Sequence, residues 1–443
     1  MACAGTTLVL LGSWVAAARS QSSNPVRAEP RGAIAITRIS LGMGGTEADG
    51  PSAFPSISAD GRFVAFESKA SNIVPNDLNA VSDIFVFDRT TRQMDIVSVD
   101  ADGRFGDESS HFPSISEDGR YVSFHSYATL SRDDYNQGVD VYVRDRVAGT
   151  TTLVSKVFDG GNILHGYAAS YYARISANGR VIAYFSSATN LIPDDANGAN
   201  EDVFVYDVQR DVNELVSVTP DGHQGSGFCS IPSTSADGRF VSFSTNSPEL
   251  VPDEFSTPPR IAPQVLVKDR ETGRMRLGSV SLAGGLGDFS AGTSSLSGDG
   301  RYVAFYSRST NLVDDDHNRT RDVYLFDFST HVMRRLTPDG VDPNGFSYGP
   351  AVSKRGNRVA FWSWANNLVA GDRNGAIDVF LYDIVTEEIS RISVGPAGEG
   401  NGDCGYPTIS GNGRLVTFPS VASNLVGGDS NGVSDVFLAE IDF

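Results

Sequence analysis

Hydrophobic and polar residues follow one scheme that recurs seven times along the chain. A serine precedes a short turn, and eight positions after each serine stands an apolar residue inside a run of β-branched and aromatic residues. The spacings between these serines are 58, 60, 59, 62, 56 and 57 residues, and the serines are Ser58, Ser116, Ser176, Ser235, Ser297, Ser353 and Ser410. A nearly fixed period of this size indicates a repeat architecture.

Each repeat predicts four antiparallel strands. In the first unit, Asp60-Gly61 separates two β-rich runs, and residues of this kind tolerate positive φ, which favours a hairpin. The run F-V-A-F follows the turn, D-I-F-V-F-D comes after a loop, and D-I-V-S-V supplies a fourth strand ending at Val99. β-branched and aromatic residues of this pattern favour strands over helices.

Four-stranded units in this number are typical of an all-β fold, a single seven-bladed β-propeller. The last unit has only three strands, and the segment Ile36 to Ser40 at the front matches a fourth strand with no unit before it. We therefore predict that Ile36 to Ser40 pairs with Asp435 to Leu438, which closes the ring and removes a free edge. Prolines such as Pro55 precede the turns, and proline is expected on the innermost strand because it cannot donate to a ladder.

The repeats assign 33–443 to one propeller domain. Residues 1–20 hold a short apolar run that ends in small residues, which predicts a signal peptide cleaved near Ala18 or Ser20, and 21–32 read as a polar linker. We therefore expect a secreted or periplasmic protein. Since no other stretch reaches the length of a membrane-spanning helix, we expect a mature chain without a membrane span, present as a monomer.

Charge and cysteine content narrow the function classes. The formal net charge of −19 argues against nucleic-acid binding, which depends on cationic groups. Outside the predicted leader, the two cysteines are Cys229 and Cys404, in equivalent positions of blades four and seven. A disulfide between them would have to bridge the channel, so two separate thiols are the favoured interpretation.

The unit P-S-I-S-x-D-G-R-[FY]-V-[AS]-F followed by D-V-F-[VL]-x-D resembles the TolB-like, WD-repeat-like propeller repeat. It is especially similar to exported bacterial proteins with tandem N-L-V-x-x-D-x-N-G-x-x-D-V-F units, which the segment from Asn424 to Phe437 nearly matches. The resemblance implies a propeller. It implies no activity, because propellers host enzymes, binding proteins and scaffolds.

The loops that link one blade to the next gather glycine, aromatic and acidic residues on one face. Rings beside a channel mouth suit recognition of a polysaccharide or protein ligand, although such rings also plug channels. The candidate ligand-binding residues are His111, His125, His165, Tyr171, Tyr172, His223, Phe346, Tyr348 and Tyr406. A binding or scaffolding module at the cell envelope or outside the cell is the favoured function.

An enzyme is the alternative. The histidines of blades two to four, with Tyr171 or Tyr172, are expected on one side of the mouth, where they would serve acid and base roles. This would be similar to propeller oligogalacturonate lyases, in which a metal neutralises a uronate and a base takes the α-proton. Loop histidines without a shared site are the competing interpretation, and no hydrolase or phosphate-loop motif is present.

An Asp/Asn pattern recurs before the third strand and raises the question of calcium. The candidate ligands are Asp77, Asn79, Asp83, Asp134, Asn136, Asp140, Asp316, Asn318, Asp322, Asp372, Asn374, Asp378, Asp429, Asn431 and Asp435. Blade three has a stretched set, Asp195, Asn197 and Asp202, and blade four has lost it. Oxygen ligands at alternate positions resemble the start of a calcium loop, which would suit a calcium-stabilised adhesion or matrix component. Asp and Asn side chains that cap a turn explain the pattern equally well.

Overall fold

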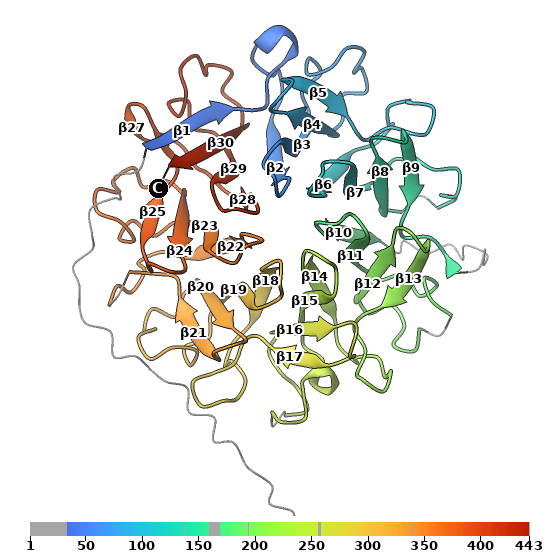
Figure 1. Ribbon diagram of the computed structural model, residues 1–443, viewed down its shortest axis with the longest axis vertical. Coiled ribbons are helices and arrows are strands. Elements are labelled where there is room, and N and C mark those ends of the chain that lie inside the picture. Colours follow the sequence, from blue (N-terminus) through green and yellow to red (C-terminus); the bar gives the residue numbers. More distant parts are fainter. Residues whose placement is uncertain are drawn as a thin grey trace, which may run out of the picture.

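The computed structural model describes residues 33–136, 138–158, 169–193, 195–255, 258–338 and 340–442. Seven four-stranded antiparallel sheets stand around one axis (Figure 1). This confirms the predicted all-β, seven-bladed β-propeller. The predicted signal peptide and linker lie outside the described residues.

Each of blades one to six runs in chain order from the axis to the rim. The innermost strands are β2 (Ser52–Ile57), β6 (Ser110–Ile115), β10 (Ser170–Ile175), β14 (Cys229–Thr234), β18 (Ala291–Leu296), β22 (Ser347–Val352) and β28 (Thr408–Ile409). The second strands are β3 (Phe63–Ser68), β7 (Tyr121–Ser126), β11 (Val181–Ser186), β15 (Phe240–Thr245), β19 (Tyr302–Ser307), β23 (Arg358–Ser363) and β29 (Leu415–Ser420). Pro55, like its counterparts, lies on or beside an innermost strand, as expected.

The third and fourth strands complete the blades. The third strands are β4 (Asp83–Asp88), β8 (Asp140–Asp145), β12 (Asp202–Asp207), β16 (Gln264–Asp269), β20 (Asp322–Asp327), β24 (Asp378–Asp383) and β30 (Asp435–Asp442). The outer strands are β5 (Gln93–Ile96), β9 (Thr150–Leu153), β13 (Val212–Leu215), β17 (Met275–Leu277), β21 (Val332–Arg335), β25 (Ile389–Arg391) and β1 (Ala33–Arg38). Short 3₁₀ segments η1 (Met43–Gly45) and η3 (Pro248–Leu250) and a hairpin of β26 (Val394–Gly395) and β27 (Gly398–Glu399) lie in loops.

The N-terminal strand closes the ring. β1 pairs with β30 in antiparallel register, with Ile36 opposite Ala439 and Arg38 opposite Phe437, and the two strands lie side by side in Figure 1. The predicted closure is therefore confirmed, although the strand begins at Ala33 and ends at Arg38. The Ile39 N–H still donates to the Val436 carbonyl at 2.8 Å, so pairing continues just past the strand.

The repeated serine and aspartate hold the first turn of each blade. The Ser58 hydroxyl donates to Asp60 Oδ1 at 2.5 Å and accepts the Phe63 N–H at 2.9 Å, while Gly61 has φ +78°. The next residue, Arg62, donates to Asp88 at 2.7 Å and ties the turn to the third strand. Equivalent arginine–aspartate pairs recur in blades two to six. The recurring Ser-x-Asp-Gly-Arg motif therefore stabilises the turn and its contact with the third strand.

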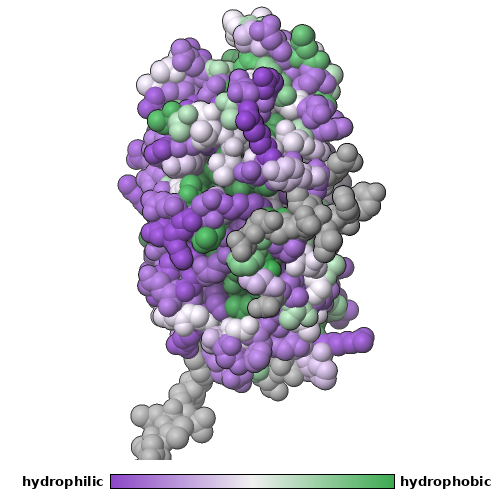
Figure 2. Space-filling model, turned by 90° about the vertical axis from the view of Figure 1, so that its right-hand side faces the viewer, coloured by the Kyte–Doolittle hydropathy of each residue, from purple (hydrophilic) through white to green (hydrophobic). Residues whose placement is uncertain are grey.

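Hydrophobic clusters fill the spaces between neighbouring blades. One cluster joins Ile84 and Val86 of blade one to Val122 and Phe124 of blade two, all fully buried. Outside these clusters the side of the molecule is mostly hydrophilic, with small hydrophobic spots (Figure 2). No helix in the described ranges has the length and apolar character that a membrane crossing requires.

The two described cysteines are separate, buried thiols, as favoured from the sequence. Burial raises the pKa of both Cys229 and Cys404 to about 12. Each lies two residues before a positive-φ position of its blade, and its Sγ contacts the hydroxyl of the facing second strand, Thr245 or Ser420, at 3.2 Å.

Candidate functional site

A bulge shapes the innermost strand of blades one to six. In blades one to six the pairing with the second strand shifts after the second residue of the innermost strand. The third position has positive φ in blades one to six, at Phe54, Phe112, Tyr172, Ile231, Thr293 and Gly349, and Tyr406, just before β28, has positive φ in blade seven. Positive φ is unfavourable for bulky and β-branched residues, and such strain is concentrated at functional sites. In every bulged blade except blade five, the bulge leaves two consecutive side chains partly exposed, whereas a regular strand would alternate.

The residues that face this bulge differ from blade to blade. They occupy the fifth position of the second strand and are Glu67, His125, Phe185, Ser244, Tyr306, Trp362 and Pro419. The following position is always serine or threonine, as in Ser68 and Thr245. A repeat fold needs constant residues only where blades are built, so these positions are free to vary and are candidates for a ligand surface.

Aromatic side chains from six blades form a continuous series, which we call the aromatic arc. Its members are Tyr306, Tyr348, Trp362, Tyr406, Phe54, Phe112 and Tyr172, whose successive ring centroids lie 4.6, 5.0, 5.9, 4.9, 4.0 and 4.5 Å apart. These rings are half-buried, and Tyr406 is 52% exposed. Arg321 lies over the Tyr348 ring at 4.9 Å. The arc therefore offers partly exposed ring faces next to polar groups.

Two of the candidate histidines lie together at one end of the arc. His111 and His125 are cross-strand neighbours with ring centroids 5.8 Å apart, and His111 Nδ1 lies 3.3 Å from Glu67 Oε2. His125 is 4% exposed and its Nδ1 has no hydrogen-bond partner. Burial, reinforced by His111 and Arg174, lowers the pKa of His125 to about 3. This imidazole is therefore neutral at physiological pH.

The other candidates are placed differently. The ring centroids of Tyr171 and Tyr172 lie 5.3 and 6.3 Å from that of His125, so these residues share one site. Phe346 packs on Tyr348 at 5.6 Å, next to the arc. His223 lies on an exposed turn after β13, where its Nε2 is 3.2 Å from Asp221. His165 lies outside the described residues.

Several candidates expected in loops lie in strands. His111, Tyr171, Tyr172 and Tyr348 belong to β6, β10 and β22, because the innermost strands begin before the proline and include the bulge. A bulge gives no periodic signal, so the sequence pattern did not reveal these strand starts. Phe54 and Phe112 were missed for the same reason, and Glu67 and Trp362 were missed because they lie in second strands opposite the bulge. These residues can be found by aligning the seven repeats and looking for the positions that differ from blade to blade.

Arg174 is an exception among the innermost strands. At its position Ser56, Ser114, Ser233 and Ser295 accept the backbone N–H of a strand in the next blade, as in the 3.1 Å bond from Ile175 to Ser114. Among the residues that the structure describes, the half-buried Arg174 guanidinium has no hydrogen-bond or ion-pair partner. Burial lowers its pKa, and Tyr172 acts on it electrostatically.

Lys354 adds a second positive group near Arg174. Its Nζ donates to the Thr234 carbonyl at 3.3 Å, and burial followed by the charge of Arg174 lowers its pKa to about 8. Blades five and six are in close contact at Lys354. The Gly298 N–H donates to the Lys354 carbonyl at 2.8 Å, and a Cβ on Gly298 would lie 2.6 Å from that oxygen. Two cations therefore lie inside an otherwise strongly acidic protein, which favours an anionic ligand.

The Asp/Asn loops form turns that join neighbouring blades. In blade five Asn318 Oδ1 accepts the Thr320 N–H at 2.8 Å, and its Nδ2 donates to Asp322 at 3.0 Å and to the Pro343 carbonyl at 3.1 Å. The same three bonds recur around Asn79, Asn374 and Asn431. The asparagine is therefore a structural bridge to the next blade-linking loop.

Within the described ranges, one group of acidic residues brings three ligand atoms within 4.8 Å of one another: Asp316, Asp322 and Asp342. An arginine stands among them, because Arg335 Nη1 lies 3.5, 3.4 and 2.6 Å from these carboxylates. Glu67, His111 and His125 do not form such a group, so the residues facing the axis do not fit a metal centre of three of these side chains.

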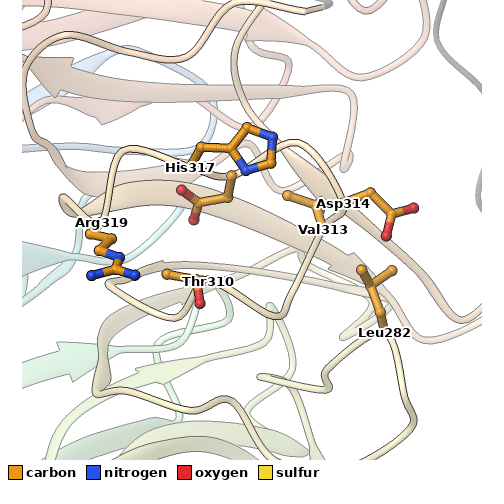
Figure 3. A pocket seen from close by; sticks show the side chains of 7 residues that line it. Leu282, Thr310, Val313, Asp314, His317 and Arg319 are labelled. Carbon is orange, nitrogen blue, oxygen red and sulfur yellow. The ribbon is translucent and has the colours of Figure 1, made fainter.

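A hollow of about 430 Å³ lies on the same loop face, apart from the aromatic arc. It is lined by Leu282, Thr310, Val313, Asp314, Asp316, His317 and Arg319, several of which Figure 3 shows around the opening. These residues come from the loop after β19 and from the turn before blade five. The hollow lacks the aromatic faces of the arc, and we place the candidate ligand site at the arc.

Comparison with known proteins supports the fold. No family model matches the sequence, and no curated protein matches it. The chain is similar to an oligogalacturonate lyase in complex with manganese (TM-score 0.54, 11% identity, 95% of this chain and 98% of that chain). It is also similar to the β-propeller domain of the trilobed protease from Pyrococcus furiosus (TM-score 0.54, 12% identity, 88% and 93%) and to a putative TolB from Agrobacterium tumefaciens (TM-score 0.41, 15% identity, 69% and 86%). At such low identities, the lyase and the protease domain show the propeller fold alone, and membership of the TolB-like repeat family stays a prediction from the sequence.

Proposed function

We propose that this protein is a binding module that takes an extended, acidic polysaccharide against the aromatic arc. The observation that carries the proposal is the arc itself, a series of half-buried rings held on strained bulges. Flat ring faces with polar handles suit sugar rings, and an arc across six blades offers several subsites in a row. The unpaired Arg174 and the neighbouring Lys354 favour a ligand with carboxylate groups.

Binding is tested with an array of neutral and uronate-containing oligosaccharides, followed by titration calorimetry on the best ligand. Trp362→Ala should weaken binding at least about 10-fold, because an aromatic residue in a binding surface commonly contributes more than about 1.4 kcal/mol. Tyr135→Ala is the matched control, since Tyr135 is 74% exposed on a loop outside the arc. Equal affinities for both variants, or binding of peptides but not of saccharides, would contradict the proposal.

Arg174 tests the acidic preference separately. Arg174→Met should abolish discrimination between uronate and neutral oligosaccharides while leaving affinity for neutral ones within about 3-fold, because the rings are unchanged. If the Arg174→Met variant still prefers uronate-containing over neutral oligosaccharides, Arg174 has no part in recognition.

A polysaccharide lyase is the second candidate, favoured by the neutral His125 beside Tyr171 and near Arg174. In β-elimination a base removes the C5 proton of a uronate, a C4=C5 double bond forms, and the C4–O bond breaks as the leaving oxygen gains a proton. Arg174 would pair with the carboxylate, and His125 or Tyr171 would move the proton. Ultraviolet absorbance of unsaturated products from oligogalacturonate separates this candidate from binding alone, and its absence with intact binding leaves the binding module.

We further propose that the protein works outside the cytoplasm, at the envelope or as a secreted monomer. The apolar run before 33–443 supports this placement. Cell fractionation with N-terminal sequencing of the mature chain tests it, and an uncleaved cytoplasmic product would contradict it.

A further inference from the structure

The last residue of the outer strand divides the blades into three kinds. In blades five, six and seven it is an arginine: Arg335, Arg391 and Arg38. In blades one, two and three it is apolar: Ile96, Leu153 and Leu215. In blade four Leu277 takes this place, and Gln264 replaces the aspartate that opens the third strand.

The arginine stands between the two aspartates of the Asp/Asn loop. Arg391 Nη1 lies 3.2 Å from Asp372 and 3.5 Å from Asp378. Arg38 Nη1 lies 3.3 Å from both Asp429 and Asp435, and Arg335 bridges the equivalent pair in blade five. These carboxylates are buried, and a buried pair of like charges needs a compensating cation. The guanidinium supplies that cation.

Blades two and three keep the aspartates and lack the arginine. Asp140 is 3% exposed and Asp202 is 1% exposed, and the Oδ2 of each has no hydrogen-bond partner. Their Oδ1 atoms accept from Ser155 and Ser217 at 2.7 and 2.5 Å. In blades five to seven the same Oδ2 is the atom that faces the arginine, as at Asp322, so the unpaired atoms point to the place where the cation stands.

Among the residues that the structure describes, no ion pair joins Asp140 or Asp202 to a positive group. The groups that act on Asp140 are Ser155, Asn136 and the carboxylate of Asp134. The groups that act on Asp202 are Ser217, Asn197 and the carboxylate of Asp195. Asn197 Oδ1 is also buried without a hydrogen-bond partner, so blade three presents two uncommitted oxygens beside a second carboxylate.

Blades two and five form a matched pair. In both, a tyrosine of the third strand, Tyr142 or Tyr324, donates to the first aspartate of the loop. In both, that tyrosine is paired across the strands with the last residue of the outer strand, which is Leu153 in blade two and Arg335 in blade five. The two sites therefore share the aspartates and the tyrosine, and blade five differs by the arginine and by a third carboxylate, Asp342.

We propose that blades two and three each bind a calcium ion, between Asp134 and Asp140 and between Asp195 and Asp202, where the arginine of blades five to seven stands in for the ion. Calcium fits because every available ligand is a carboxylate, amide or carbonyl oxygen, and the remaining positions of its six to eight ligands go to water and main chain. In blade one Asp83 Oδ2 accepts a bond from Asn79 at 2.8 Å, and we make no assignment there.

The test supplies the missing arginine. Calcium bound by the full chain is counted by equilibrium dialysis against millimolar calcium chloride, and melting is compared with and without a chelator. Leu153→Arg and Leu215→Arg should each remove one bound equivalent, and the double variant two. Each should also reduce the calcium-dependent rise in melting temperature. Leu277→Arg is the control, because blade four lacks the aspartate, and it should leave the bound calcium unchanged.

The reverse change keeps the proposal testable if an arginine variant fails to fold. Arg335→Leu leaves the three clustered carboxylates of blade five without their cation and should add one equivalent of calcium. Calcium that fails to bind the unaltered chain would overturn the proposal. So would Leu153→Arg and Leu215→Arg chains that keep every equivalent, and either result would leave these loops as structural turns.

Discussion

Closure of the ring by β1 should carry a large part of the stability of the whole propeller. Ile39 follows this strand, is 1% exposed, and packs between blade seven and blade one, with Val436 and Leu438 on one side and Val64 on the other. Ile39→Ala removes buried methyl groups and leaves a cavity. Substitutions of this kind cost about 2–5 kcal/mol, and we expect about 3 kcal/mol here.

Deletion of residues 33–41 is the stronger form of this perturbation. It removes the pairing with β30 and takes Arg38 away from the buried Asp435, and loss of one partner of a buried ion pair costs about 3–5 kcal/mol. Together with the lost burial of Ile39, the cost approaches the roughly 5–15 kcal/mol that holds a typical protein folded. The truncated chain should therefore lose cooperative unfolding.

Urea unfolding followed by tryptophan fluorescence measures both effects. Val147→Ala is the matched control, since Val147 is 77% exposed in a turn and its truncation should change stability by less than about 0.5 kcal/mol. If Ile39→Ala shifted the midpoint no more than Val147→Ala, or if the truncated chain unfolded like the full one, ring closure would not be a main source of stability.

Three further outcomes are expected. Acid should destabilise the protein through His125, because the folded state keeps this imidazole neutral down to about pH 3 while the unfolded chain protonates near pH 6.5. The free energy of unfolding should fall by about 2 kcal/mol at about pH 5. His125→Phe should reduce this pH dependence in unfolding midpoints measured across pH. Gly119→Ala should cost about 1–3 kcal/mol more than Gly149→Ala, since both have φ +69° but only at Gly119 would the new Cβ meet Phe63, at 2.1 Å; equal melting temperatures would exclude the clash. Cys229 and Cys404 should resist a thiol reagent until the protein unfolds, and rapid labelling of either residue in the native chain would contradict their burial.

The fold could be predicted because the repeated residues are the ones that build a blade. Asp60-Gly61 sets a hairpin, the serine before it bonds the turn, and alternating apolar runs fill the spaces between blades. The closure of blade seven followed from counting strands, since an incomplete last unit and a lone first strand fit each other. These features depend on local chemistry and on period, which a single sequence carries.

The candidate site was less accessible to sequence reasoning. His111, His125, Tyr171 and Tyr172 do meet, but the bulge that turns two adjacent side chains toward the axis depends on backbone geometry. The role of Arg174 could not be recognised for a related reason. Its residue type carries no signal until the structure shows that it has no acidic partner among the described residues. The aspartates were noticed, whereas the arginine that separates one group of blades from another lies on a different strand.

The last blade has a consequence for how the protein is made. Arg38 and Asp435 are 397 positions apart in the chain, and their strands pair only after the final strand has been synthesised. Contacts between such distant segments slow folding because a long loop must be ordered before they form. During translation six blades can assemble in order. The unpaired edge of β1 and the apolar side of blade one stay exposed to solvent until blade seven is complete. The protein therefore acquires its final form in one late step, and aggregation competes with that step more than with any earlier one.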